Sequence, residues 1–491
     1  MTIVTRFAPS PTGFVHIWSL RTVLYNYLFT KQNDGKFMLR IEDTDRARFV
    51  EGSVENLQNV LASVGLIPDE GPNNPGDKGP YFQSERLDIY KQHIQKLIND
   101  DKAYYCFCSS DRLTELREEQ QSLGLPTKYD KKCRYLTPEE TQQKLESGAP
   151  YTIRLKVPDN TEISFEDAVR GKITIPSKDV DEQVLMKTDG YPTYHFAVVV
   201  DDYLMWVTDI IRGDEWIPST PKHVLLYKAF GWEMPKFSHV PPLLWAGGKK
   251  LSKRTGDVSV ESFLAKWFLP EAMLNYISLL GWNPKTTQEI FSMKELIDVF
   301  KLSDVHKAWA IFEEERMAGF NSEYIKSYEL PMLWNKVKTY LSRYDSEYLE
   351  KLWDFPEEFI LKILSELQTR MKTFDEFKWL TEYFFEEIAD LNPELIVNPK
   401  MKVASISDAK TALQVTLEIL NDGEINLDTP ENIKNTFIEQ IKKREMKNGQ
   451  VLWPTRVALS MQQFSPGALE LIYVFWREKS IQRISKVLKQ M

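Results

Sequence analysis

Two short polar segments, about half a chain apart, constrain the fold of this chain more than any other feature. The first, His-Ile-Trp-Ser at 16–19, follows an apolar run from Ile3 to Ala8 and a turn rich in proline. After it, the apolar spacing from Leu20 to Lys31 predicts an amphipathic helix. A strand, a turn and a helix N-terminus make an anion site, because free N–H groups and the helix dipole face the ligand.

The second segment, Lys250 to Arg254, carries three cations and one serine after a Gly-Gly turn. Cations in such a loop can neutralise the charge that develops on a transferring phosphate, and His16 can donate to phosphate oxygens. Together the two segments predict a nucleotide site built from two parts of a parallel sheet. Taken singly, each is more often polar surface than a site.

The length and composition are typical of a multidomain globular protein. A chain of 491 residues predicts three or more domains, and 42% apolar residues suffice for several cores. No apolar run reaches the roughly 18 residues of a membrane helix, and the first residues are not an apolar targeting segment. Three cysteines are too few for a disulfide framework, so we expect a cytoplasmic protein.

The charge is unevenly distributed along the chain. Residues 441–491 carry ten Lys or Arg and three Asp or Glu, a balance of +7. Because the whole chain carries −9, the first 440 residues carry −16. A basic segment on an acidic protein is typical of contact with a phosphate backbone, although an ordinary basic helical face has the same composition.

The hydrophobic periodicity also changes along the chain. Residues 1 to about 105 alternate between strand and helix patterns, as in half of a doubly wound sheet. Polar helical and short strand patterns interrupt this alternation between about 106 and 185, which predicts an insertion. The alternation then returns, and beyond about 330 the pattern is almost wholly helical.

Seven sequence blocks, in the same order, resemble the glutamyl-tRNA synthetase family, class I aminoacyl-tRNA synthetases of bacterial and organellar type. The resemblance runs nearly end to end. The blocks are RFAPSPTGFVHI (6–17), RIEDTDRAR (40–48), GPYFQSERL (79–87), MKTDGYPTYH (186–195), IIRGDEWIPSTPKHVLLYKAFGW (210–232), KKLSKRTGDVSV (249–260) and LPEAMLNYISLLGWNP (269–284).

The resemblance implies an α/β fold with five parts. A class I Rossmann-type catalytic domain with a parallel sheet carries an α+β insertion, and an all-α anticodon-binding region follows. The expected boundaries are 1–105 for the first catalytic half, 106–185 for the acceptor-stem insertion with its cysteines, 186–259 for the second catalytic half with the KLSKR loop, 260–325 for a helical stem-contact region and 326–491 for the anticodon-binding domain.

The resemblance also implies a reaction. ATP and L-glutamate form glutamyl-adenylate, with Mg²⁺ present, and the glutamyl group then passes to the terminal ribose of tRNA-Glu. Neither step needs a protein nucleophile, so catalysis depends on positioning and charge stabilisation. By resemblance, the ATP phosphates contact His16, Lys250, Ser252 and Lys253, of which His16, Lys250 and Lys253 are the expected catalytic residues. We expect a monomer that does not bind membranes.

Glutamate requires a cation for its side-chain carboxylate, and arginine grips a carboxylate with two hydrogen bonds. One neighbour departs from the family, because Val198 stands where an asparagine is usual. Two structural alternatives stay open: Glu42 could pair with Arg40 or Arg46, and Arg212 could belong to a core salt bridge. The resemblance assigns the glutamate site to Arg6, Ala8, Ser10, Glu42, Tyr194 and Arg212.

All three cysteines lie near one another in the insertion, as Cys106, Cys108 and Cys133. Thiolates from one Cys-X-Cys and a distant Cys suit tetrahedral zinc, although free cysteines are often only buried. Some family members bind structural zinc with these cysteines and a tyrosine four residues before the last, which is Tyr129 here. Tyr135 or water is the alternative fourth ligand.

The helical C-terminal region supplies candidate tRNA contacts. Its basic side chains suit a phosphate backbone or the anticodon, and solvated surface is the equal alternative for each. The candidates are Arg370, Lys442, Lys443, Arg444 and Arg456.

Five tryptophans occupy positions where relatives usually carry glycine: Trp18, Trp206, Trp267, Trp309 and Trp476. Trp18 stands where the family's glycine lets the helix backbone approach the adenine ring, so an indole there predicts poor ATP binding. One hypothesis is that these residues are encoded by UGA codons that the organism reads as glycine. A degenerate paralogue is the alternative, and Gly319, where relatives often carry Trp, runs against simple recoding.

Three other functions compete with tRNA-Glu charging. The sequence does not distinguish an enzyme that charges only tRNA-Glu from one that also charges tRNA-Gln. A relative that glutamylates a tRNA base would lack the anticodon-binding region. A non-catalytic RNA-binding paralogue would follow if Trp18 is genuine.

Overall fold

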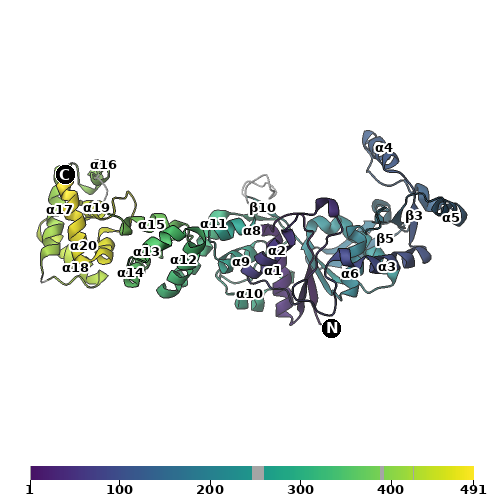
Figure 1. Ribbon diagram of the computed structural model, residues 1–491, viewed down its shortest axis with the longest axis horizontal. Helices are drawn as coiled ribbons and strands as arrows, with labels where there is room; N and C mark the ends of the chain where they lie inside the picture. The colour runs from purple at the N-terminus through teal and green to yellow at the C-terminus, as the bar shows by residue number, and fades with distance from the viewer. Residues whose placement is uncertain (1, 246–258, 388–391, 424) are drawn as a thin grey trace. The chain divides into compact units, whose positions relative to one another are not determined.

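The computed structural model describes residues 2–245, 259–387, 392–423 and 425–491. The chain forms two compact units, Met1–Leu264 with Pro270–Glu314, and Ala265–Leu269 with Glu315–Met491. Figure 1 shows strands in the first unit and helices throughout the second. The five-part division expected from the sequence stays a prediction.

Parallel strands organise the first unit. β1 (Val4–Phe7) pairs with β2 (Lys36–Leu39), and β8 (Asp209–Gly213) pairs with β9 (Lys236–Val240), both in parallel. Two hydrogen bonds of 2.9 Å, from the Val4 N–H to the Thr208 hydroxyl and from the Thr208 N–H to the Val4 carbonyl, join β1 to the chain entering β8. The parallel α/β architecture expected from the sequence is confirmed.

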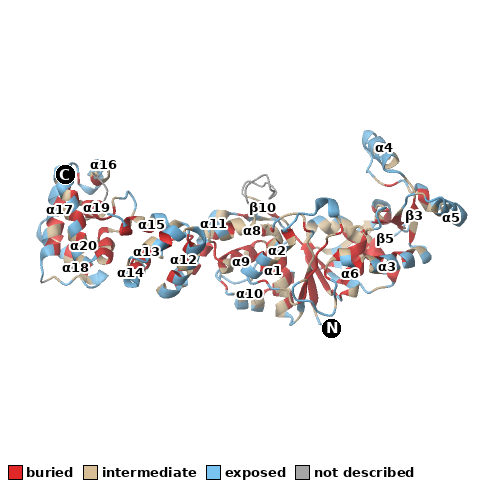
Figure 2. Ribbon diagram, viewed as in Figure 1, coloured by how far each residue is buried: buried red, intermediate tan, exposed pale blue. Residues whose placement is uncertain are grey.

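Buried helices pack against these strands. α1 (Ile17–Gln32), α6 (Tyr194–Leu204) and α7 (Thr220–Phe230) present many buried side chains, because each lies inside the unit rather than on its rim. Figure 2 shows buried strands between α1 and α6. The other helices of this unit that lie outside the insertion are α2 (Ser53–Ser63), α3 (Leu87–Asn99), α8 (Val260–Ala265), α9 (Pro270–Leu279) and α10 (Met293–Val299).

Between the two parallel pairs, the elements from β3 (Ala103–Cys106) to β7 (Val184–Met186) form an α+β insertion. β3, β4 (Thr152–Leu155) and β7 form an antiparallel sheet. β5 (Glu162–Asp167) and β6 (Gly171–Pro176) form a hairpin, and β5 also meets β9 in parallel. Two largely exposed helices, α4 (Ser110–Ser122) and α5 (Pro138–Glu146), complete the insertion, and β10 (Leu243–Trp245) pairs with β11 (Ala310–Phe312) beyond it.

The second unit is built from amphipathic helices. In α12 (Leu330–Tyr344), Leu333, Val337 and Leu341 are buried at four-residue spacing, which places them on one face. The remaining helices are α11 (Glu314–Ser327), α13 (Ser346–Leu352), α14 (Glu357–Leu367), α15 (Glu376–Phe385), α16 (Pro393–Ile396), α17 (Ile406–Asn421), α18 (Pro430–Lys443), α19 (Asn448–Ser460) and α20 (Ala468–Gln490). Within the ranges that the structure describes, none of the helices has the length and apolar character needed to cross a bilayer.

Candidate functional site

A pocket of about 330 Å³ lies where β1 turns into α1. Ser10 and His16 line it from the turn and the helix start, and Ile41 and Leu57 line it from neighbouring elements. His16 is the N-cap of α1, and its carbonyl accepts the Leu20 N–H at 3.0 Å. The strand, turn and helix N-terminus predicted from the sequence are therefore confirmed, and they surround a hollow.

Trp18 also lines this pocket, from the first turn of α1. Its indole stacks on the His16 imidazole, with ring centroids 4.2 Å apart and planes 12° apart. The indole thus occupies space beside the side chain that is expected to meet phosphate. Lys250, Ser252 and Lys253 lie outside the described residues.

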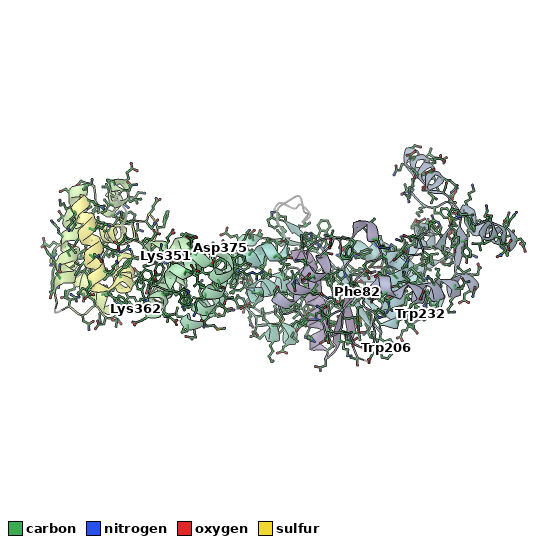
Figure 3. The ribbon with its side chains drawn as sticks, viewed as in Figure 1. Phe82, Trp206, Trp232, Lys351, Lys362 and Asp375 are labelled. Atoms are coloured by element: carbon green, nitrogen blue, oxygen red, sulfur yellow. The ribbon has the colours of Figure 1, made fainter. Side chains whose placement is uncertain are left out.

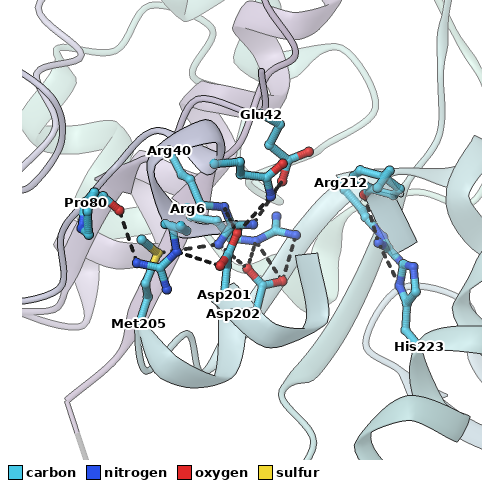
Figure 4. A network of polar contacts seen from close by, with 12 residues as sticks. Arg6, Arg40, Glu42, Pro80, Asp201, Asp202, Met205, Arg212 and His223 are labelled. Atoms are coloured by element: carbon cyan, nitrogen blue, oxygen red, sulfur yellow. Dashed lines mark hydrogen bonds and ion pairs between the residues drawn. The ribbon is translucent and has the colours of Figure 1, made fainter. Parts of the chain in front are cut away.

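Buried charges next to the pocket are paired. Arg6, on β1, donates from Nε to Asp202 Oδ1 at 3.1 Å, and Arg40 donates from Nη1 to the same oxygen at 2.8 Å. All three side chains are at most 4% exposed, and Figure 4 shows Asp202 between the two guanidinium groups. Burial alone would raise the pKa of Asp202, but Arg6 and Arg40 outweigh it and hold that pKa below its usual range.

Glu42 belongs to the same cluster. Its Oε1 accepts from Arg40 Nη2 at 3.0 Å, which is one of the structural pairings that the sequence left open. Burial raises the pKa of Glu42 to about 7, although Arg40 pulls in the other direction. A neighbouring carboxylate, Asp201, accepts from Arg86 Nε at 2.7 Å and from the Tyr90 hydroxyl at 2.8 Å. Three buried arginines thus face three buried carboxylates.

Arg212, near the end of β8, is also buried but has different partners. Its Nε donates to His239 Nε2 at 3.1 Å, and its Nη2 donates to the Thr220 hydroxyl at 2.9 Å. Its other contacts are His223 Nδ1 at 3.3 Å and the Tyr194 hydroxyl at 3.4 Å. Among the residues with described positions, no carboxylate forms an ion pair with Arg212, and burial lowers its pKa.

The other residues expected at the glutamate site lie near these two arginine groups. Tyr194 begins α6, the helix that also carries Asp202, and burial raises its pKa. Ala8 follows β1 directly, and Ser10 lies in the turn that leads to His16. Val198 packs in the hydrophobic core of the unit. The turn after β1 and helix α6 therefore bring the expected residues toward one region.

Several residues of this region were not predicted from the sequence. Asp202 and Asp201 end a valine-rich buried helix, and two adjacent carboxylates after such a run are a signal that could have been read. His223 lies in the block quoted above but was not singled out. Nothing in the sequence around His239 indicated that it would contact Arg212, because that contact depends on how distant segments meet in the fold.

The three cysteines converge with Tyr129. Their sulfur atoms lie within 4.8 Å of one another, and the Tyr129 hydroxyl is 3.4 Å from both Cys106 and Cys108. The hydrogen bond from the Cys133 thiol lowers the pKa of Cys106 to about 4. In tetrahedral zinc sites the sulfurs are about 3.8 Å apart, since each zinc–sulfur bond is about 2.3 Å. The 3.6 Å between Cys108 and Cys133 fits that spacing.

Comparison with known proteins agrees with this geometry. Residues 2–319 match the family model for the catalytic domain of class I tRNA synthetases (E and Q), and residues 333–488 match an anticodon-binding domain. The chain is 44% identical to a glutamate–tRNA ligase of Clostridium tetani over 98% of this chain and 96% of that protein. A glutamate–tRNA ligase of Clostridium acetobutylicum is 43% identical, over 98% and 97%.

The chain belongs to the glutamate–tRNA ligase family of class I aminoacyl-tRNA synthetases.

Solved structures agree with that family. A crystal structure of a glutamate tRNA ligase from Elizabethkingia meningosepticum in complex with its amino acid superposes with a TM-score of 0.89 at 34% identity, covering 100% of this chain and 99% of that one. A glutamate-tRNA synthetase from Elizabethkingia anophelis gives 0.86 at 33% identity, covering 100% of both chains. The catalytic and anticodon-binding parts of the family are thus both present.

Three of the five unusual tryptophans have backbones that glycine favours. Trp206, Trp267 and Trp476 have φ of 62°, 54° and 56°, whereas none of the other ten tryptophans, all within the described residues, has positive φ. Bulky residues with positive φ are genuine outliers. Trp476 has ψ of 177°, a combination that essentially only glycine adopts. Figure 3 labels Trp206, which is 68% exposed, and Lys362, whose ammonium lies 4.4 Å from the Trp476 ring centroid.

The end of α6 shows what Trp206 replaces. The Trp206 N–H bonds to the Tyr203 carbonyl at 3.1 Å, and the Val207 N–H bonds to the Asp202 carbonyl at 2.8 Å. This is the hydrogen-bond pattern of a Schellman motif, whose left-handed position is usually glycine. α7 ends with the same pattern at Gly231, which has φ of 69°. Two helices of one unit therefore end alike, one on tryptophan and one on glycine.

The candidate tRNA contacts divide into two groups. Lys442, Lys443 and Arg444 are exposed around the end of α18. Arg456 is half-buried and donates to the Ser465 hydroxyl at 3.0 Å, and Arg370 donates to the Ser465 carbonyl at 3.3 Å. The second pair holds a turn of the helical unit, whereas in the first group Lys443 pairs with Glu439 at 2.7 Å and Arg444 with Glu418 at 3.3 Å on the exposed surface.

Proposed function

We propose that this chain joins L-glutamate to tRNA-Glu through glutamyl-adenylate, using ATP and Mg²⁺. Family membership gives the reaction type. The observation that carries the choice of amino acid is Arg212, a buried guanidinium whose described partners are all neutral. A buried cation without a counter-ion is costly, and a carboxylate from a ligand would remove that cost.

In this proposal the substrate lies between the two arginine groups. Its side-chain carboxylate meets Arg212 and its ammonium meets Glu42 and Tyr194, with Arg6, Ala8 and Ser10 completing the site. His16 and the N–H groups at the start of α1 hold the ATP phosphates, and Lys250, Ser252 and Lys253 approach them from their loop. The α-carboxylate of glutamate then attacks the α-phosphate, and pyrophosphate leaves. The protein contributes positioning and charge.

We also propose that the working protein carries glycine at positions 18, 206, 267, 309 and 476, because UGA codons are read as glycine. The left-handed backbones at Trp206, Trp267 and Trp476 support this proposal, and so does the place of Trp18 in the nucleotide pocket. Trp309 is exposed and has neither feature. Intact-mass analysis of the protein from its own organism decides it, because each replacement lowers the mass by a fixed step and an unshifted mass would refute recoding.

Glutamate-dependent ATP–pyrophosphate exchange tests the function. We expect the Trp18→Gly protein to exchange when tRNA-Glu is present, and the Trp18 protein to exchange more slowly with a raised KM for ATP. Exchange in neither protein would favour a non-catalytic RNA-binding role. The same assay followed by transfer to tRNA-Gln separates an enzyme that charges only tRNA-Glu from one that charges both.

We further propose that Cys106, Cys108, Cys133 and Tyr129 hold a structural zinc ion. The sulfur spacing supports this, as does the Tyr129 hydroxyl close to two of the thiols. When bound, zinc would tie β3 to the loop at 129–133 without entering the reaction. We expect Cys106→Ser to lower thermal stability more than turnover per folded molecule. An unchanged melting curve, with no metal by elemental analysis, would remove this proposal.

The partners follow from the same assignment. We propose that Lys442, Lys443, Arg444 and, more weakly, Arg370 and Arg456 contact tRNA, and that the chain acts as a cytoplasmic monomer. Phosphate contacts lower affinity uniformly across sequences when removed, and they reduce its salt dependence. A Lys442→Ala, Lys443→Ala protein should therefore bind tRNA-Glu with a shallower salt dependence.

A further inference from the structure

The side chains around Arg212 form one continuous series of hydrogen bonds, and this series begins at a carboxylate. Asp167 Oδ2 lies 2.6 Å from His239 Nδ1, and His239 Nε2 lies 3.1 Å from Arg212 Nε. On its other side, Arg212 meets His223 Nδ1 at 3.3 Å, and His223 Nε2 lies 3.0 Å from His195 Nδ1. Figure 4 shows the Arg212 and His223 part of this series, apart from the Arg6 and Arg40 cluster.

These hydrogen bonds determine which ring nitrogen of each histidine carries the proton. Arginine can only donate, so His239 Nε2 and His223 Nδ1 must both accept. A ring nitrogen that accepts carries no proton. His239 therefore holds its proton on Nδ1, where Asp167 accepts it, and His223 holds its proton on Nε2, where His195 accepts it. Each of these rings is neutral and has one tautomer.

The surroundings keep the rings neutral. Burial, followed by the Arg212 charge, lowers the pKa of His223 well below its usual value, and burial with nearby Lys222 lowers that of His195 to about 3. The charge of Asp167 is spread over backbone donors, since Oδ1 accepts the Arg170 N–H at 2.8 Å and the Val169 N–H at 3.0 Å. Among these five hydrogen-bonded side chains, the carboxylate of Asp167 reaches Arg212 only through His239.

We propose that His223 and His239 are positioning residues that determine the specificity of the amino-acid site. They hold Arg212 with lone pairs rather than with carboxylates, so its full charge remains available to the substrate. The ligand class selected is an amino acid with a side-chain carboxylate, and an amide side chain would leave the buried guanidinium without a counter-ion. This inference rests on the proposed function, in which Arg212 binds the side chain of glutamate.

Two substitutions of almost equal size test it. In His223→Asn the amide oxygen can replace Nδ1 as a neutral acceptor, and in His223→Asp a carboxylate stands in the same place. Both are made in full-length protein with Trp18→Gly, and kcat/KM is measured for glutamate and for glutamine in tRNA-dependent exchange. We expect His223→Asn to keep the preference for glutamate. His223→Asp should lose roughly 10- to 100-fold of that preference, the size of a charge-assisted hydrogen bond, through a higher KM for glutamate at unchanged KM for ATP.

The outcomes separate this inference from the proposed function. Equal preferences in His223→Asn and His223→Asp would overturn it. An Arg212→Gln protein with unchanged KM for glutamate would sink the proposed site itself. If Arg212→Gln raises that KM while His223→Asp keeps the preference, only the role of the histidines fails.

A second measurement covers the case in which His223→Asp does not fold. Nitrogen-15 NMR of the histidine-labelled protein reads the tautomer and charge of each ring directly. We expect a neutral His223 with its proton on Nε2 at pH 7, because its Nδ1 accepts from Arg212 and its Nε2 faces His195. A doubly protonated ring, or a proton on Nδ1, would overturn the proposal.

Discussion

Arg40 and Arg212, two buried arginines of one unit, are held in opposite ways. Arg40 has Asp202 at 2.8 Å, Glu42 at 3.0 Å and Asp201 at 3.8 Å, so carboxylates surround it. Arg212 has two imidazoles and two hydroxyls. Buried charges are tolerated when they are paired. The difference therefore separates a cation that stabilises the fold from one that is left for a ligand, and each prediction below acts on that difference.

The largest effect is expected from breaking the paired cluster. Asp202→Asn leaves Arg6 and Arg40 without their shared carboxylate, and removing one partner of a buried pair costs about 3–5 kcal/mol. Urea unfolding of the folded protein measures this loss. Asp88→Asn is the control, because Asp88 is 89% exposed and its one ion pair among the described residues is with Lys91, and a surface pair contributes about 0–1 kcal/mol. Similar losses for both would contradict the role given to Asp202.

Arg212→Gln should affect catalysis more than stability, the reverse of what is expected for Asp202→Asn. We expect kcat/KM for glutamate to fall about 100-fold, because a charge-assisted contact to the substrate is lost. The free energy of unfolding should fall less than in Asp202→Asn, since the substitution removes a buried cation whose described partners are all neutral. Exchange kinetics and urea unfolding are measured on the same sample. A loss of stability as large as that of Asp202→Asn would show that Arg212 is a structural arginine.

The two regions should respond to pH with opposite signs. Burial raises the pKa of Glu42 from its ordinary 4.5 to about 7 in the folded protein, so the folded state binds its proton more tightly between those values. The free energy of unfolding should therefore fall as pH rises from about 4.5 to about 7, by up to about 1.4 kcal/mol per pH unit. Glu42→Gln removes this contribution.

His223 gives the opposite contribution. Its folded pKa lies well below 6.5, so below about pH 6.5 the unfolded chain binds the extra proton and stability rises with pH. His223→Asn removes that rise. Urea unfolding at pH 5, 6 and 7 distinguishes the two substitutions, and slopes that change in the same direction would contradict the assignment.

The smallest effect concerns α6, which carries Tyr194 on the Arg212 side and Asp202 on the Arg40 side. Trp206→Gly should raise the free energy of unfolding by about 1 kcal/mol, because a left-handed backbone costs a residue with a side chain roughly 1–2 kcal/mol. Trp379→Gly is the control, since Trp379 is similarly exposed but lies inside α15. That change should lower stability by about 1 kcal/mol. A lower free energy of unfolding in both substituted proteins would argue that Trp206 is a native tryptophan.

The sequence predicted some parts of this comparison and missed others for a physical reason. β1 and α1 could be predicted, because their apolar spacing and the turn between them are local. Arg212 was expected through family resemblance, since a carboxylate substrate requires a cation. Which cation keeps a counter-ion could not be predicted, because Asp202 and His239 reach their arginines across 196 and 27 residues of chain.

The tryptophans show the same limit. Family patterns indicated that Trp206 and Trp476 replace glycine, but a sequence does not give φ. The fold supplies it, because the end of α6 and the kink in α20 require left-handed residues. The fold and the family pattern therefore point to the same positions independently at three of the five sites.

A crystal structure of the full chain with glutamate bound tests the central claim most directly. The side-chain carboxylate should lie within hydrogen-bond distance of a terminal nitrogen of Arg212, with His223 and His239 still accepting from that arginine. A side-chain carboxylate bound to Arg6 or Arg40, with Arg212 unaltered and uncontacted, would contradict the account.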